Sequence, residues 1–406
     1  IVGKQNLLTS KAERYPYAFD STNKSSVKLP DAIVFVETEK QIQELVNFAY
    51  ENEIPLIARG AGTNLVGGCF CPKGGIVVNF SKMNKILEIN PTNMTAKVQP
   101  GVVVGELQKE VEKFGLFFPP DPANLSVSTI GGSIALSSGG AKTFKYGSTK
   151  DYVLNLRVVL QDGNVIETGK SVSKNVTGYN LTQLFVGSEG TLGIVTEATL
   201  KLIPKPEASR LVLAYFDSLK DVILQNHLMP ASLDFLDRKT LQTIEKFYPS
   251  GFLDKEAALF IEVEGSTEKV VDLCKKNGVT DIVCANTQEE CDRLWTSRRA
   301  SFAACAKLKP NVVADDVVVP RTKISELVEG IKSICEKNHL IVCMMGHIGD
   351  GNIHPNIPLD LSNPEDVENY KNAKKEFHQL AVKLGGTLSG EHGIGLEKSE
   401  YMTRTL

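Results

Sequence analysis

The first half of the chain alternates short apolar runs with amphipathic stretches and glycine-rich turns, which predicts strands and helices in turn. Four apolar residues recur at helical spacing over 39–51 and predict a helix with one apolar face: Ile42, Leu45, Val46 and Ala49. A second helix is expected over 104–114, with Gly115 beyond it as a stop. Strands are predicted over 32–36, 54–58, 75–79, 86–89, 95–99, 153–160 and 165–167.

The second half has longer helical patterns and fewer strands. Strands are predicted over 211–216 and 257–264, and helices near 219–227, 237–247, 267–276, 288–307, 323–338 and 364–384. Pro204 and Pro206 give the clearest boundary signal, so we expect one domain over 1–206 and a second over 207–406. The predicted fold class is α+β, with an antiparallel sheet in the second domain.

Composition narrows the functional classes. The 406 residues are enough for two or three domains, and a net charge of −3 favours neither nucleic acid nor an anionic membrane as partner. No apolar run reaches the ~18 residues of a membrane helix, so we expect no transmembrane segment and a cytoplasmic location, with any membrane contact made through a partner. The eight cysteines form no Cys-x-x-Cys pair, so an iron–sulfur cluster in this chain is not expected.

A glycine-rich loop follows the predicted strand 54–58 and runs from Arg59 to Gly68. A Rossmann dinucleotide loop would continue into a helix, but here Pro72 and another strand follow, so NAD on a Rossmann fold is not expected. The remaining interpretations are a nest of backbone N–H groups for a pyrophosphate and a plain glycine turn. Further glycine segments at 128–132, 138–140 and 187–195 favour the nest, because a flat phosphate-bearing ligand could approach them closely.

The segment 345–354 holds two of the six histidines of the chain, on either side of Asp350-Gly351. If that dipeptide is a two-residue turn, His347 and His354 are directly opposite each other on a hairpin, with Cβ atoms roughly 5 Å apart. Such a pair suits one divalent cation, with Glu391 as a third ligand and His392 left as a base. The alternative is a polar hairpin with solvated or core histidines.

These motifs resemble a known family. Arg59–Gly68, Thr129–Gly132 and Gly187–Val195, with 119–122 and 145–147, are similar to the FAD-binding domain of the vanillyl-alcohol-oxidase type. The segments 347–354, 389–395 and 317–321 resemble the glycolate oxidase large subunit and D-lactate dehydrogenase branch, whose relatives include D-2-hydroxyglutarate dehydrogenase. The resemblance implies a two-subdomain FAD-binding domain followed by an α+β cap domain whose C-terminal part returns to the flavin.

The resemblance also implies a set of cofactor-binding residues. They are Arg59, Gly60, Ala61, Gly62, Thr63, Asn64, Gly67, Gly68, Pro120, Asp121, Ser128, Thr129, Gly131, Gly132, Ser138, Gly139, Tyr146, Glu189, Gly190, Gly193, Ile194 and Val195. Relatives with covalent FAD often attach it to a histidine of the first loop. No histidine precedes His227, so we expect non-covalent FAD, with Cys69 and Cys71 as packing residues.

The family's divalent metal, which could be zinc, iron(II) or manganese, falls on His347, His354 and Glu391. The family's base corresponds to His392, and Arg298 corresponds to a clamp for the substrate carboxylate, a role suited to its planar fork. The implied reaction is oxidation of a D-2-hydroxy acid, D-lactate or glycolate above all, to the 2-keto acid. The hydroxyl proton would pass to the base and a hydride to FAD.

Some positions depart from the family pattern. Ser133 and Ser138 replace asparagines, which puts local flavin hydrogen bonding in doubt. Asp315 and Asp316 stand where the 2-hydroxyglutarate branch carries a basic residue, which disfavours a dicarboxylate substrate. The chain opens at Ile1 instead of Met and stops at Leu406, short of the family's Asn-Pro-Gly-Lys-like C-terminal motif, so either it is trimmed there or the last flavin-side contact is missing. Whether residues are missing at both ends stays open.

Electrons would leave to a partner: an iron–sulfur subunit, an electron-transferring flavoprotein or a quinone. A homodimer is a further possible assembly. Two competing functions are a hydrogen-peroxide-forming oxidase and a non-catalytic FAD-binding subunit of a glycolate-oxidase-type complex. A structural metal site beneath an unrelated pocket is a further alternative, in which metal removal would unfold the protein. The particular hydroxy acid, metal and acceptor stay open at this point.

Overall fold

The computed structural model describes all residues except 24–26, 207–208, 219–228 and 405–406. It divides into two compact units. The first unit comprises Ile1–Gly140, Gly147–Lys205 and Glu391–Glu397, and the second Ala141–Tyr146, Pro206–Gly390 and Lys398–Leu406. The main division therefore falls between Lys205 and Pro206, beside the proline-rich segment. The inclusion of Ala141–Tyr146 in the second unit was not predicted.

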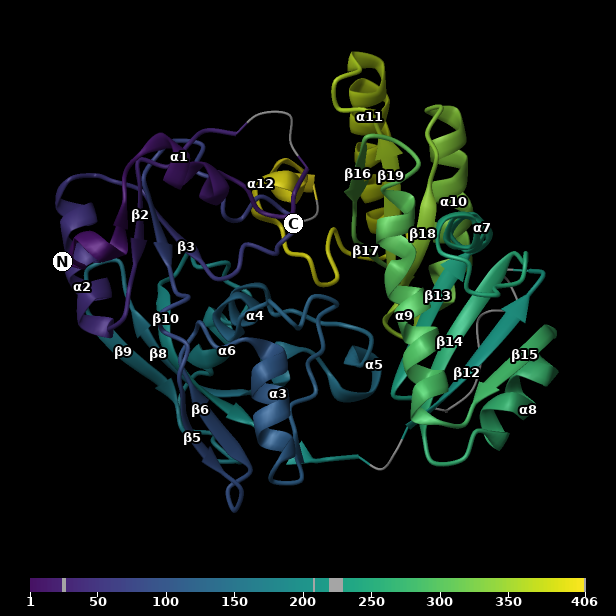
Figure 1. Cartoon of the computed structure of the whole chain (residues 1–406), viewed down its shortest axis with the longest axis horizontal. Coiled ribbons are helices and arrows are strands. Elements are labelled where there is room, and N and C mark those ends of the chain that lie inside the picture. Colours follow the sequence, from purple (N-terminus) through teal and green to yellow (C-terminus); the bar gives the residue numbers. More distant parts are fainter. Residues whose placement is uncertain (24–26, 207–208, 219–228, 405–406) are drawn as a thin grey trace. The chain divides into compact units, whose positions relative to one another are not determined.

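One sheet of the first unit is mostly parallel (Figure 1). Its strand order is β1-β2-β4-β3, in which β2, β4 and β3 run parallel: β1 (Leu7–Leu8), β2 (Ala32–Phe35), β4 (Ile76–Asn79) and β3 (Leu56–Arg59). Helix α2 (Glu39–Glu51) begins with a capping box between Thr38 and Gln41 and has the predicted bounds. Its predicted apolar face packs against β2 and β4.

The other large sheet of the first unit is antiparallel, in the order β5-β6-β10-β8-β9. Val159 of β8 packs in the same core as α2, which joins the two sheets. The strands are β5 (Ile86–Asn90), β6 (Thr95–Val98), β10 (Ile194–Lys201), β8 (Val153–Val159) and β9 (Val165–Gly169). The smaller elements are α1 (Lys11–Arg14), α3 (Val104–Glu112), β7 (Leu116–Phe117), α4 (Ile130–Leu136), α6 (Leu181–Phe185) and β11 (Ile203–Pro204). The element after the glycine-rich loop of β3 is strand β4, as expected for a loop that is not of the Rossmann type.

The second unit is built on one antiparallel sheet in the order β15-β12-β14-β13-β18-β19-β16, with β17 paired to β19. The strands are β15 (Val279–Ala285), β12 (Ser209–Phe216), β14 (Ala257–Glu264), β13 (Ser232–Asp237), β18 (Cys343–His347), β19 (Asn352–Leu359), β16 (Asn311–Ala314) and β17 (Val317–Val318). Of these, β12 and β14 were predicted as strands from the apolar pattern.

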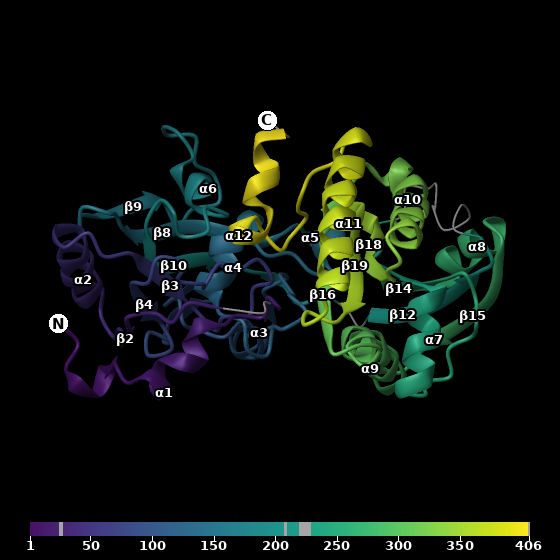
Figure 2. The ribbon, with the colours of Figure 1, turned by 90° about the horizontal axis from the view of Figure 1, so that it is seen from above.

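Helices cover both faces of this sheet (Figure 2). Alternate residues of β12 belong to two different cores: Val212 and Phe216 pack with α8, α10 and α11, and Leu211 and Tyr215 pack with α7 and α9. The helices are α7 (Arg238–Phe247), α8 (Glu268–Lys276), α9 (Gln288–Cys305), α10 (Ile324–Lys337) and α11 (Pro364–Lys383), all close to their predicted bounds. The short α5 (Thr143–Tyr146) also belongs to this unit, and α12 (Gly395–Lys398) begins in the first. The helix predicted over 219–227 lies outside the described residues.

The predicted pairing of the histidine hairpin is wrong by two residues. Met345 of β18, not His347, is opposite His354 of β19. The turn is longer than two residues because a 3-10 turn, Ile348–Asp350, precedes Gly351, which has a φ of 79°. His347 pairs instead with Asp234 on the neighbouring strand β13. A shift of two residues leaves both histidines on the same face of the sheet, as diagonal neighbours.

Candidate active site

The first unit contains a cavity between its two sheets and the N-terminal end of α4. It has about 530 Å³ of empty space, part of it open to solvent. Its lining includes nine of the predicted cofactor-binding residues: Arg59, Gly60, Thr129, Gly131, Gly132, Gly190, Gly193, Ile194 and Val195. It also includes residues that the sequence did not single out: Ala58, Phe80, Pro100, Ile134, Ala135, Phe185 and Ser188.

The glycine-rich loop beside this cavity has two parts. Over residues 66–69 the backbone N–H groups are already bonded. Asn64 Oδ1 accepts from Val66 and Gly68. Thr22 accepts from Gly67, and Asp20 accepts from Cys69. Over residues 60–65 no described residue accepts a hydrogen bond from the backbone N–H groups. A run of unused N–H groups after a strand is suited to a phosphate, so the first part of the loop is the better candidate for the pyrophosphate.

Two buried hydroxyls adjoin residues of this cavity's lining in the sequence, and two glycines of the lining are closely packed. The hydroxyls of Ser128 and Ser133 are buried, and no described residue bonds to either. A Cβ on Gly60 would lie 2.2 Å from Thr129 Oγ1, and one on Gly131 would lie 2.7 Å from Pro100 Cβ. Because any larger side chain would meet these neighbours, glycine keeps the backbone open to a ligand.

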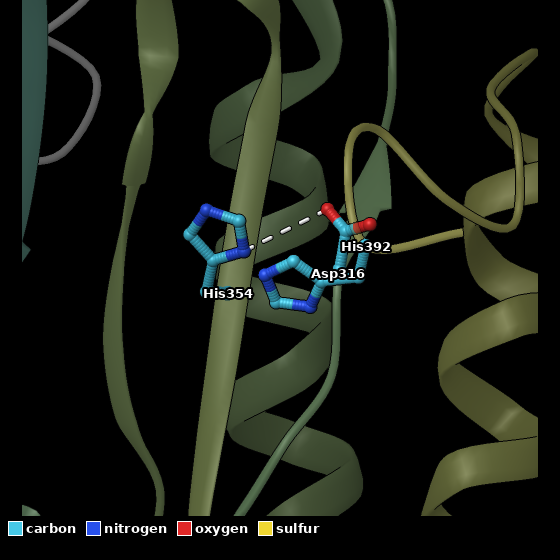
Figure 3. Close-up of side chains that lie close together, drawn as sticks. All are labelled: Asp316, His354 and His392. Carbon is cyan, nitrogen blue, oxygen red and sulfur yellow. Dashed lines mark ion pairs between the residues drawn. The ribbon is translucent and has the colours of Figure 1, made fainter. Parts of the chain in front are cut away.

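Two histidines of the second unit have the geometry of a metal-binding pair. The rings of His347 and His354 have their centroids 5.3 Å apart, and each offers a ligand nitrogen within 4.8 Å of the other. His347 Nδ1 lies 2.6 Å from Asp234 Oδ1, and His354 Nδ1 lies 3.6 Å from Asp316 Oδ1 (Figure 3). At His347 the carboxylate is at hydrogen-bond distance from Nδ1, which favours the tautomer that leaves Nε2 to bind a metal, the usual arrangement at metal-binding histidines. The separation at His354 is longer than a hydrogen bond.

Asp234 is the central member of a buried charged chain. It is 2% exposed, and its Oδ2 accepts from Arg298 Nη2 at 2.9 Å. Burial would raise the pKa of Asp234, but the nearby His347 and Arg298 lower it below its usual value. The guanidinium of Arg298 is therefore already engaged on one side, whereas its Nε is a buried donor for which the described residues provide no acceptor.

The aspartates 315 and 316 are buried and paired, not exposed to an open pocket. Lys398 Nζ lies 3.2 Å from Asp315 Oδ1 and 3.7 Å from Asp316 Oδ2, and His378 Nε2 lies 3.3 Å from Asp315. Although burial would raise it, the pKa of Asp315 is far below its usual value because of Lys398 and His378. Asp316 Oδ2 also accepts from Ser389 Oγ and the backbone N–H of Gly390, at 2.6 and 2.9 Å. These contacts fix the chain immediately before Glu391.

Glu391 and His392 belong to the first unit. Their segment is held there by the first unit's own residues: Glu189 accepts from the N–H groups of Ile394 and Gly395 at 2.7 and 2.8 Å. Val66 in the glycine-rich loop accepts from the N–H of Leu396 at 2.9 Å. The carboxylate of Glu189, predicted to contact the cofactor, thus binds backbone of the histidine segment, while its neighbours Ser188 and Gly190 line the cavity.

Comparison with known proteins decides the family. The FAD binding domain family matches residues 30–169, and the C-terminal domain family of FAD linked oxidases matches residues 205–406. Glycolate oxidase subunit GlcD of Bacillus subtilis (strain 168) is 41% identical over 420 residues, covering 100% of this chain and 89% of that relative. The chain belongs to this family of FAD-linked oxidases.

Two further relatives and one solved structure are also similar to this chain. GlcD of Escherichia coli (strain K12) is 33% identical and covers 98% of this chain and 82% of its own. D-lactate dehydrogenase of Anaerostipes hadrus is 34% identical and covers 93% of this chain and 84% of its own. The fold is also that of p-cresol methylhydroxylase, with a TM-score of 0.82 at 18% identity over 100% of this chain and 89% of the other. The chain is thus an FAD-linked oxidoreductase with the predicted flavoprotein fold.

Some predicted cofactor residues of the oxidase lie away from the cavity lining. Asn64 braces its own loop, and Tyr146 is in the second unit, where its hydroxyl contacts Glu264. The others outside the lining are Ala61, Gly62, Thr63, Gly67, Gly68, Pro120, Asp121, Ser128, Ser138, Gly139 and Glu189. Burial raises the pKa of Cys69 and of Cys71 to about 11, so both are thiols at neutral pH, which agrees with a packing role.

Sequence reasoning missed Asp234 and assigned Asp316 no role beside the histidines. Asp234 stands between Leu233 and Phe235 in a strand that is buried throughout, and a lone carboxylate in such a run is the signal that could have found it.

None of the helices that the structure describes is long and apolar enough to cross a membrane.

Proposed function

We propose that this FAD-linked oxidase converts a D-2-hydroxy acid, D-lactate or glycolate above all, to the 2-keto acid. The relatives named glycolate oxidase subunit and D-lactate dehydrogenase support a hydroxy acid as substrate. The observation that carries the proposal is the pair His347 and His354, whose ring centroids lie 5.3 Å apart, with Asp234 hydrogen-bonded to Nδ1 of His347. A subunit that only bound FAD would have no use for two histidines prepared in this way.

In this proposal His347, His354 and Glu391 hold a divalent metal, zinc, iron(II) or manganese, through two imidazole nitrogens and a carboxylate. When bound, FAD supplies a hydride acceptor and the metal a Lewis acid for the substrate hydroxyl. Asp234 keeps the proton of His347 on Nδ1, so that Nε2 has its lone pair free for the metal.

Arg298 and His392 act on the substrate. Arg298 binds the substrate carboxylate, and its buried Nε donor, with no acceptor among the described residues, fits this role. His392 accepts the hydroxyl proton while the Cα–H bond breaks, as a neutral imidazole does in general-base catalysis. Arg298 is fixed by Asp234 at 2.9 Å, so the substrate would meet a donor group that is already oriented.

FAD binding falls to the first unit and is non-covalent in this proposal. The unused N–H groups of residues 60–65 receive the pyrophosphate, and the cavity bounded by Thr129, Gly131 and Ile194 receives the flavin. The protonated thiols of Cys69 and Cys71, with pKa values of about 11, are poor nucleophiles for a flavin bond.

The reduced flavin passes its electrons to a partner in this proposal. The two GlcD relatives are named as subunits, which supports an assembly with another chain. An iron–sulfur subunit, an electron-transferring flavoprotein or a quinone would each serve as the acceptor.

The experiment that tests the proposal is anaerobic bleaching of the flavin absorption by a panel of D- and L-2-hydroxy acids, with and without a chelator. Rapid, chelator-sensitive bleaching by one D-acid is the expected result. If no acid bleaches the flavin-loaded protein, the chain is a non-catalytic FAD-binding subunit. Rapid reoxidation by oxygen with peroxide release would instead favour the competing function, a hydrogen-peroxide-forming oxidase that passes its electrons to oxygen and not to a partner.

The base is tested by His392→Asn, with His339→Asn as a matched control. His339 is exposed and has a φ of 54°, which asparagine tolerates, so the control changes the same group outside the site. We expect His392→Asn to slow flavin reduction by about 10²–10⁴-fold, the usual contribution of a positioned base. The control should reduce its flavin at the wild-type rate, and an equal rate in both variants would remove His392 from the mechanism.

A further inference from the structure

Glu189 has a strained backbone beside the flavin cavity. It is not a glycine, yet its φ is 52°, between Gly187 at 82° and Gly190 at 76°. The left-handed conformation is unfavourable for any residue with a Cβ, because that atom comes too close to the following carbonyl oxygen. Its N–H donates to Ala135 of α4 at 2.8 Å, which fixes the loop to a helix that lines the cavity. Such strain is kept where the surrounding structure needs that orientation of the side chain.

The strained orientation directs the carboxylate at one turn of the chain. One oxygen accepts from the N–H of Ile394 at 2.7 Å, and the other from the N–H of Gly395 at 2.8 Å. A Cβ on Gly393 would lie 3.0 Å from Glu189 Oε1, so the turn packs tightly on the carboxylate. All of these residues belong to the first unit.

We propose that Glu189 is a positioning residue of the reaction, which fixes the turn 393–395 and thereby sets the place of His392 on the flavin domain. The inference rests on the proposed role of His392 as the base. The loop that carries Glu189 also lines the cavity through Ser188 and Gly190. One loop therefore contacts both the cofactor cavity and the backbone that follows the base, so the base and the flavin are placed by the same element.

The chemistry of the contact requires a carboxylate. Two N–H donors meet two different oxygens, and a glutamine at 189 would present one oxygen and one NH₂ group, which repels the second donor. Alanine would keep the strained backbone and lose both acceptors, whereas glycine would relieve the strain and lose them as well. The three variants thus distinguish the effect of losing the carboxylate from the effect of relieving the backbone strain.

The test compares Glu189→Ala, Glu189→Gln and Glu189→Gly in FAD-loaded protein. The matched control is Glu245→Ala, because Glu245 accepts from the backbone N–H groups of Ser250 and Phe252 at 2.9 and 2.8 Å in the second unit. Three quantities are measured: amide hydrogen exchange of Ile394 and Gly395, the dissociation constant of FAD, and the limiting rate and half-saturation of anaerobic flavin reduction at saturating FAD. The substrate is the 2-hydroxy acid that reduces the wild-type protein fastest.

We expect faster exchange at Ile394 and Gly395 in every Glu189 variant, and a limiting rate that falls by about 10–100-fold, the cost of a base misplaced by about 1 Å. The half-saturation and the FAD dissociation constant should stay within about threefold of wild type. Glu245→Ala should speed exchange only near residue 250 and leave the rate unchanged. Glutamine, which keeps one acceptor, should be the mildest of the three substitutions.

Three outcomes would overturn the inference. Unchanged exchange at 394–395 would show that the carboxylate does not hold the turn. Faster exchange with a wild-type rate would show that the turn does not place a catalytic group. A rate loss that vanishes when FAD is raised would make Glu189 a cofactor-binding residue only. Failure of the base proposal is recognised separately, because His392→Asn would then reduce its flavin at the wild-type rate. Amide exchange at residues 394 and 395 reports only whether Glu189 holds the turn and does not depend on which group is the base.

Discussion

Asp234→Asn is the most informative single substitution in the second unit. The carboxylate uses one oxygen for His347 Nδ1 and the other for Arg298 Nη2, at 2.6 and 2.9 Å. Asparagine has only one oxygen. If that oxygen stays with the charged Arg298, the NH₂ group faces Nδ1 of His347, which must then become an acceptor. Its proton moves to Nε2, the atom proposed to bind the metal.

The magnitude follows from these contacts. Loss of a carboxylate behind a metal-binding histidine costs about 10–100-fold in metal affinity. Removal of one partner from a buried ion pair costs about 3–5 kcal/mol of the free energy of unfolding, and Asp234 is only 2% exposed. We therefore expect metal affinity and stability to fall together.

The assay is calorimetric titration of zinc and manganese into metal-stripped, FAD-loaded protein, together with urea unfolding of the metal-free form. Asp237→Asn is the matched control, since Asp237 is on the same strand and is 1% exposed. Its three hydrogen bonds, from Thr240 N, Thr240 Oγ1 and Met344 N, all go to one oxygen, which asparagine retains. Metal affinity within twofold of wild type in Asp234→Asn, or an equal loss in the control, would refute the reasoning.

Three further predictions concern stability and flavin binding. Asp315→Asn leaves Asp316, at 3.7 Å, as the carboxylate partner of Lys398 beside two backbone carbonyls, and should lower the free energy of unfolding at neutral pH by about 3 kcal/mol. The lowered pKa of Asp315 means that this contribution is present at neutral pH and lost as pH falls below about 4, so urea unfolding of wild type and variant should converge in acid. Gly131→Ala places a Cβ 2.7 Å from Pro100 and should weaken FAD binding about tenfold, measured by flavin fluorescence. The control is Gly132→Ala, whose Cβ would have Thr129 Oγ1 as its nearest neighbour at 3.3 Å and which should have a smaller effect. Gly351→Ala adds a Cβ 1.9 Å from the carbonyl oxygen of Val319 at a φ of 79° and should cost more than about 2 kcal/mol in urea unfolding; a smaller loss would mean that the hairpin turn can adjust.

The first unit was largely predictable because its signals are local. The periodicity of Ile42, Leu45 and Val46 gave the bounds of α2, and the strand after the glycine-rich loop excluded a Rossmann fold. In the second unit, β13 was missed because Asp234 and Asp237 interrupt its apolar pattern. Both are buried and paired with residues far along the chain, so only the tertiary structure explains their presence in a core strand.

The histidine hairpin shows where turn propensity fails. Asp350-Gly351 favours a two-residue turn, but the buried side chain of Ile348 packs in the core of the second unit and extends the connection. The register moved by two residues, yet the prediction that both histidines share a face survived, because side chains alternate with a period of two. Asp234 and Asp316, the carboxylates beside His347 and His354, come from strand β13 and from the connection between β16 and β17, and no fixed spacing in the sequence indicated them.

The return of Glu391–Glu397 to the first unit has a consequence for the order in which the protein is made. A ribosome makes residues 206–390, nearly all of the second unit, before these seven emerge. Until then Glu189 and Val66 have no partners in the turn at 394–396. Domains usually fold as units, N-terminal first, but here a segment of the first unit is made after nearly all of the second. A nascent chain therefore gains its proposed base only after the strands of all three large sheets have been synthesised, so a chain that stalls before residue 391 has every residue of the cavity lining and lacks the base.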